Sequence, residues 1–86
     1  MITKNKLLEE QLLEDVVSND LSIAVAAASS QYATNAVLNI AARDKDKEVR
    51  LAAVNNVNIS IEILQFLASD IDDEISTIAK LKLEAK

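Results

Sequence analysis

The chain has 86 residues, of which 50% are hydrophobic and 27% charged, and its net charge is −5. The absence of Cys and His excludes disulfides and cysteine metal sites and removes the commonest general base, so we expect no enzyme and no cofactor. The acidic balance disfavours direct nucleic-acid binding, and no apolar run approaches the ~18 residues of a membrane span, so we expect a soluble cytoplasmic protein with a single domain over residues 1–86.

Gly and Pro are both absent, and good helix formers such as Ala, Leu, Glu and Lys are frequent. This composition favours helices joined by short polar corners and disfavours tight hairpins. Apolar residues recur at three- and four-residue spacing between these corners. The sequence predicts six helices: Lys4–Val17, Leu21–Ser30, Asn35–Arg43, Lys47–Asn55, Ile61–Ala68, and a last helix that carries Ile71, Ile75 and Ala79 and frays after Lys80.

Polar residues at the corners are suited to cap these helices, since Ser, Thr and Asp side chains accept hydrogen bonds from the first free backbone N–H groups. We expect this role for Asp20, Thr34, Ser60 and Asp70. The spacing also predicts which residues face the core in the second and fourth helices. These are Ile23, Ala26, Ala27 and Ser30 in the former, and Val49, Ala52, Ala53 and Asn56 in the latter.

Much of the chain recurs at a constant offset of 26 positions. The stretch from Leu38 to Asn56 reads LNIAARDKDKEVRLAAVNN, and the stretch from Leu64 to Lys82 reads LQFLASDIDDEISTIAKLK. A fixed period of this size is the signature of a stacked-repeat protein. The sequence therefore predicts three helix pairs, in units of approximately residues 4–30, 31–56 and 57–86.

The stretch from Asp44 to Asn56, DKDKEVRLAAVNN, resembles the leucine-rich repeat variant and, more loosely, HEAT-like repeats. In such repeats an Asp-containing corner is followed by Val-Arg, an Ala-Val run and Asn. The resemblance covers about residues 12–79, but the corner prolines of the family are missing and its Arg occurs only at Arg50. It implies an all-α, short right-handed α-solenoid of about three helix pairs that is used for protein–protein contact, with no chemistry of its own.

A flank of the even-numbered helices lies off the predicted inward faces. Val25, Leu51 and Val54 are apolar residues on this flank, and Arg50 and Asn55 are polar residues beside it. In a solenoid the second helices line the concave surface, so these five residues are our candidates for a shallow groove that binds a partner helix. The alternative is that Val25 packs on Leu51 between neighbouring units and belongs to the core.

Two charged features have simpler interpretations than a binding site. Arg50 is expected to pair with Asp44 or Asp46 and to tie its helix to the preceding corner. The acidic corner from Asp70 to Glu74 is short and has no Gly, so it does not fit a calcium loop and is better explained by helix capping.

The function predicted from the sequence is a non-enzymatic module that binds another protein, and the acidic surface suggests a partner with a basic surface or patch. Two alternatives stay open. One is an acidic inhibitor that imitates nucleic acid, because corner carboxylates recur along the chain. The other is a structural homo-oligomer, because the terminal helices are leucine-rich over a wide arc.

Overall fold

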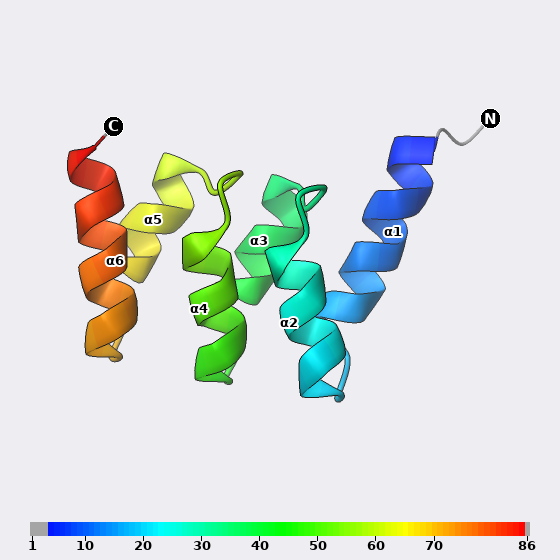
Figure 1. Ribbon diagram of the computed structural model, residues 1–86, viewed down its shortest axis with the longest axis horizontal. Coiled ribbons are helices and arrows are strands. Elements are labelled where there is room, and N and C mark those ends of the chain that lie inside the picture. Colours follow the sequence, from blue (N-terminus) through cyan, green and yellow to red (C-terminus); the bar gives the residue numbers. More distant parts are fainter. Residues whose placement is uncertain (1–3, 86) are drawn as a thin grey trace.

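The computed structural model describes residues 4–85, and within this range all regular structure is helical, with no strand. The helices follow one another in chain order, with the first and last helices at opposite ends of the molecule (Figure 1). Among the described residues no helix is both long and apolar enough to cross a membrane. The helices are α1 (Lys4–Val16), α2 (Leu21–Ser29), α3 (Asn35–Ala41), α4 (Lys47–Asn55), α5 (Ile61–Leu67) and α6 (Asp73–Glu84).

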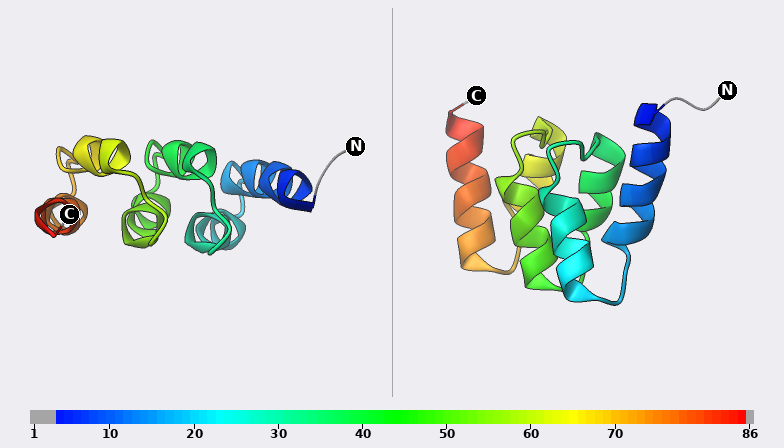
Figure 2. Two further views of the ribbon diagram at one scale, coloured as in Figure 1. Left: turned by 90° about the horizontal axis from the view of Figure 1, so that it is seen from above. Right: turned by 45° about the vertical axis from the view of Figure 1, so that its right-hand side comes forward.

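The helices form two layers. Figure 2 shows α1, α3 and α5 in one layer and α2, α4 and α6 side by side in the other. In the second layer α2 contacts α4, and α4 contacts α6. The Cα atoms span 40 × 28 × 15 Å, so the molecule is a slab two helices thick. Because α3 and α5 have only seven residues each, their stability depends on packing across the slab.

The predicted helix boundaries agree with the structure to within two residues except at the last helix. Asp20, Thr34 and Ser60 cap α2, α3 and α5 as expected. The cap of α6, however, is Asp72 and not Asp70. Asp70 instead accepts the backbone N–H of Asp72, which leaves Ile71 in the corner and 95% exposed.

The core runs between the layers, and its largest fully buried side chains are Leu38, Leu64, Leu67, Ile75, Val16, Val37, Val49 and Val54. The predicted inward face of the second helix is wrong in part. Ile23 is 42% exposed and Ala26 is exposed, whereas Ala24, Ala27 and Ala28 are buried. Since α2 reads LSIAVAAAS, apolar residues surround it and their pattern does not single out one face.

The three corners that precede α2, α4 and α6 are built alike. Ser18 Oγ accepts the backbone N–H of Asp20 at 3.0 Å, Asp44 Oδ1 that of Asp46 at 2.7 Å, and Asp70 Oδ1 that of Asp72 at 2.9 Å. The second residue of each pair then caps the helix that follows, with ψ between 111° and 124°. Each corner therefore holds a side-chain oxygen and a capping carboxylate in the same arrangement relative to the helix that follows.

At the opposite edge of the slab, Asn56 joins α4 to the end of α2. Its side-chain N–H₂ group donates to the carbonyl oxygens of Ala28 and Ser30, both at 2.9 Å, while its Oδ1 accepts the backbone N–H of Asn58. Asn58 in turn donates to the carbonyls of Gln31 and Ala33. These bonds satisfy backbone acceptors where α2 ends and tie the second pair of helices to the first.

Candidate functional site

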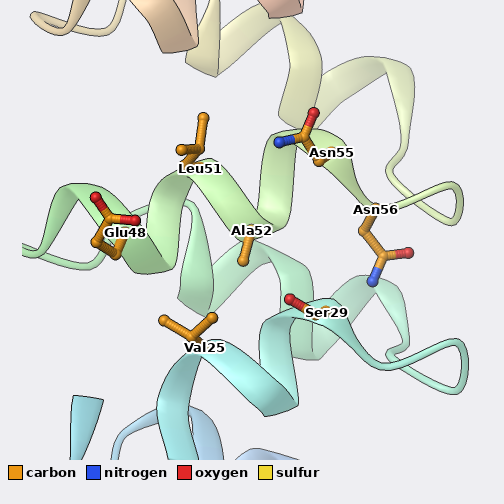
Figure 3. Close-up of a pocket in the computed structure, with 7 residues that line it drawn as sticks. All are labelled: Val25, Ser29, Glu48, Leu51, Ala52, Asn55 and Asn56. Atoms are coloured by element: carbon orange, nitrogen blue, oxygen red, sulfur yellow. The ribbon is translucent and has the colours of Figure 1, made fainter. Parts of the chain in front are cut away.

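A hollow of about 270 Å³ lies between α2 and α4. Figure 3 shows the residues that line it, which are Val25, Ser29, Glu48, Leu51, Ala52, Asn55 and Asn56. The hollow is open to solvent along the surface of the second layer, and its floor is the small side chain of Ala52. It therefore presents apolar surface from two neighbouring helices at one place.

The two branched apolar residues of the hollow play different parts. Val25 points from α2 toward α4, whereas Leu51 points away from α2 (Figure 3). Both are half-buried and pack against the core, so part of each side chain stays in contact with water. Val25 and Leu51 are thus partly core and partly surface.

Polar groups surround this apolar floor. Ser29 and Asn55 are exposed at the ends of their helices, and Glu48 is exposed in the first turn of α4. Asn56 closes one end of the hollow, where its amide is occupied by the carbonyls of α2. An apolar floor with a polar rim can hold the apolar stripe of a helix while the rim forms hydrogen bonds with its flanks.

The structure divides the five predicted site residues. Val25, Leu51 and Asn55 line the hollow together. Val54 does not, because its side chain is 0% exposed and faces the core. The prediction was wrong for Val54 because the buried stripe of α4 consists of Val49, Ala53 and Val54, while Ala52, expected inward, is half-buried and lies on the floor of the hollow.

Arg50 also lies outside the hollow and fixes two corners to each other. Its Nε donates to Asp70 Oδ2 at 2.8 Å and its Nη2 to Asp70 Oδ1 at 3.3 Å. Its Nη1 donates to the carbonyl oxygens of Asp44 and Lys45. The expected partner, the carboxylate of Asp44 or Asp46, was wrong: within the preceding corner Arg50 binds only backbone carbonyls, and the carboxylate comes from the next corner.

A second ion pair joins the same corners. Lys47 Nζ lies 3.2 Å from Asp72 Oδ2 and 3.4 Å from Glu74 Oε1. The hydrogen bond to Asp72 raises the pKa of Lys47, with Glu74 adding to the effect. The Ile75 backbone N–H, together with Lys47, lowers the pKa of Asp72. Two cations of α4 therefore hold the corner that leads into α6.

A second hollow, of about 360 Å³, lies between the first and second corners and was not predicted from the sequence. The 26-residue offset carried a signal for it, because Ala24 and Leu21 stand 26 positions before Arg50 and Lys47. Two long cations are thus replaced by shorter apolar side chains. The residues that line this corner hollow are Val17, Ser18, Asn19, Leu21, Ala24, Asp44, Lys45, Asp46 and Val49.

The corner carboxylates mostly have structural partners. Asp20, Asp46 and Asp72 cap helices, and Asp70 is paired with Arg50. In the part of the chain that the structure describes, no group of three or more acidic side chains is arranged to hold a metal ion.

Comparison with known proteins found no matching family model, no similar curated protein and no similar solved structure.

Proposed function

We propose that the chain is a short right-handed α-solenoid of three helix pairs, of the leucine-rich repeat variant or HEAT-like kind, and that it binds another protein without chemistry of its own. The like-built corners support this proposal, since they follow one another at the same 26-residue offset as the sequence repeat. The two layers of alternating helices are the arrangement that such a stack requires (Figure 2).

The observation that carries the proposal is the hollow between α2 and α4. Its small floor residue, Ala52, stands 26 positions before Ile78 of α6, so the third unit has a larger side chain at the equivalent position. The space beside Val25 thus exists because Ala52, between α2 and α4, has a small side chain. A hollow of this kind accepts a side chain from outside the molecule.

The occupant that fits best is an amphipathic helix of a partner protein with a basic residue next to its apolar stripe. One or two apolar side chains of such a helix would enter beside Val25 and above Ala52. A Lys or Arg on its flank would lie near Glu48, which is exposed on the rim. The net charge of −5 favours the approach of a basic partner at low ionic strength.

The test is to fill the hollow from inside with Ala52→Ile, which copies the residue found at the equivalent position of α6. A photoreactive group at the exposed Ser29 is used first to capture a partner, which is then purified. Dissociation constants are measured for that partner with the wild type, with Ala52→Ile, and with the control Ala26→Ile. Ala26 is the equivalent residue of α2 and is exposed outside the hollow.

Ala52→Ile is expected to weaken binding by about tenfold or more, the effect of losing one well-buried apolar contact. Ala26→Ile is expected to bind as the wild type does. Equal affinity of the Ala52→Ile variant would show that the hollow is not the binding surface. Capture of a second copy of the chain alone would favour a structural homo-oligomer instead, and an affinity that falls steeply with salt and is equal for both variants would favour an acidic mimic of nucleic acid.

A further inference from the structure

We propose that the corner hollow binds the guanidinium group of an arginine side chain from another protein. This site is separate from the hollow between α2 and α4, and the inference does not depend on what binds there. Two neighbouring pairs of corners support it. Arg50 lies between the second and third corners, whereas no arginine lies between the first and second.

The contacts of Arg50 show which groups hold a guanidinium between two corners. Arg50 donates to the carbonyl oxygens of Asp44 and Lys45 and to the carboxylate of Asp70. The residues 26 positions before these three are Ser18, Asn19 and Asp44, and all three line the corner hollow. The residue 26 positions before Arg50 is Ala24, which lines the hollow as well. The acceptor groups are therefore present around the hollow without the side chain that would use them.

Lys47, the second cation between the second and third corners, also has no counterpart between the first and second. Lys47 pairs with Asp72, and the residues 26 positions earlier are Leu21 and Asp46, which again line the hollow. Among the described side chains, no ion pair involves Asp44 or Asp46. Two carboxylates thus border the hollow with only backbone N–H groups as partners, those of Asp46 and Glu48.

The backbone of the first corner is arranged like that of the second. The first corner has the same side-chain-to-backbone bond as the second, from the Asp20 N–H to Ser18 Oγ, and its cap has nearly the same φ and ψ. Within residues 4–85, no hydrogen bond is found to the carbonyl oxygens of Ser18 and Asn19. These oxygens correspond to the pair that accepts Arg50 Nη1 one unit later.

The chemistry selects a guanidinium over an ammonium. Two carbonyl oxygens and the Asp44 carboxylate match the planar fork of five N–H donors, whereas an ammonium is compact and more strongly hydrated. Apolar side chains of Val17, Leu21 and Val49 line the rest of the hollow and can cover the methylene stem of an arginine. The site thus offers both parts of an arginine side chain a matching surface.

The first test supplies the arginine from within the chain. Ala24→Arg should place a guanidinium in the hollow and raise the urea midpoint, with the unfolding equilibrium constant reduced about tenfold, the effect of a hydrogen bond to a charged group. Asp44→Asn removes the carboxylate charge but keeps the oxygen that accepts the Asp46 N–H, a role that the neutral Ser18 fills in the first corner. The gain should be lost when both substitutions are combined, and a gain that persists in the double variant would overturn the proposal.

The second test uses the wild-type protein and does not depend on how Ala24→Arg folds. N-acetyl-arginine amide is titrated in, and the backbone amide shifts of Asn19, Lys45 and Asp46 are followed by NMR. Saturable shifts at these residues are expected, with much weaker shifts from the lysine and citrulline analogues. Asp44→Asn should weaken binding about tenfold, and Asp73→Asn, which changes an exposed carboxylate of α6, should not.

Three results of this titration would overturn the proposal: no saturable shift, a lysine analogue that binds as tightly as the arginine analogue, or equal effects of Asp44→Asn and Asp73→Asn. Free arginine serves as a further probe. If it bound more tightly than the blocked amino acid, the site would be one for a small molecule and not for a protein side chain.

Discussion

At the scale of single residues, the Arg50 side chain donates four hydrogen bonds outside the core. It satisfies two backbone carbonyls and one carboxylate, and its own side chain is 12% exposed beside an Asp70 side chain that is 7% exposed. Ion pairs this well shielded from water differ from surface pairs, because removing one partner leaves the other charge desolvated.

We therefore expect Arg50→Ala to lower the free energy of unfolding by about 2–4 kcal/mol, between the effects known for exposed and for buried pairs. Urea unfolding at constant m value measures it. The matched control is Arg43→Ala. Arg43 is exposed, and its guanidinium lies 4.2 Å from the centroid of the Phe66 ring, so we expect a loss of about 0.5–1 kcal/mol. Equal losses for the two variants would contradict the role given to Arg50.

The caps at Asp20 and Asp72 make stability depend on pH. The Ser22 hydroxyl and the Ile23 and Ser22 backbone N–H groups lower the pKa of Asp20, and the Ile75 N–H and Lys47 lower that of Asp72. Because the folded pKa lies below the ordinary value of 3.8, the stability from these groups is present above pH 3.8 and is lost as the pH falls through the folded pKa.

The contribution of Lys47 to stability depends on pH in the opposite direction. Its pKa is raised above 10.5, so its contribution is present below pH 10.5 and is lost as the pH rises through the folded pKa. The urea midpoint should therefore fall at both ends of the pH range. In Asp72→Asn, which keeps an oxygen at the cap, both declines should be smaller, and declines equal to those of the wild type would show that the Asp72 carboxylate does not cause them.

At the scale of elements, the sequence predicted where helices begin and end better than how they face. The caps at Asp20, Thr34 and Ser60 depend on local spacing, and local spacing can be read from the chain. The faces of α2 could not be read in this way, because its residues are nearly all small and apolar. Which of its alanines are buried depends on α1 and α4, which pack against it.

Asn56 is the residue that joins two elements most directly, and its replacement tests that role. In Asn56→Asp the side-chain oxygen can still accept the Asn58 N–H, but the two bonds to the α2 carbonyls are lost and a negative charge faces them. We expect a loss of about 2–3 kcal/mol in the free energy of unfolding. Asn55→Asp is the matched control, since Asn55 is exposed on the same turn of α4, and it should change stability by less than about 0.5 kcal/mol.

At the scale of the whole molecule, the two hollows lie at the same junction. Both are formed between the first and second helix pairs, one between α2 and α4 and one at the corners. The junction between the second and third pairs has Arg50, Lys47 and Ile78 at the equivalent positions. Small residues at one junction and large or charged residues at the next thus distinguish corners that are built alike.

Part of the candidate site could be predicted from this pattern. Val25, Leu51 and Asn55 were identified because they lie off the inward faces at a shared offset, and this depends only on helical periodicity. The burial of Val54 and the pairing of Arg50 with Asp70 could not be predicted, because both depend on how far one helix is rotated and shifted against its neighbour. Contacts of that kind are set by the packing of the helices against one another.

We propose that a partner protein docks between α2 and α4. The most direct measurement is the methyl NMR spectrum of the chain with and without the purified partner. We expect the largest shifts at Val25 and Leu51, and little change at Ile40 and Ile61, which are exposed on the helices of the other layer. Large shifts at Ile40 and Ile61, with none at Val25 and Leu51, would contradict it.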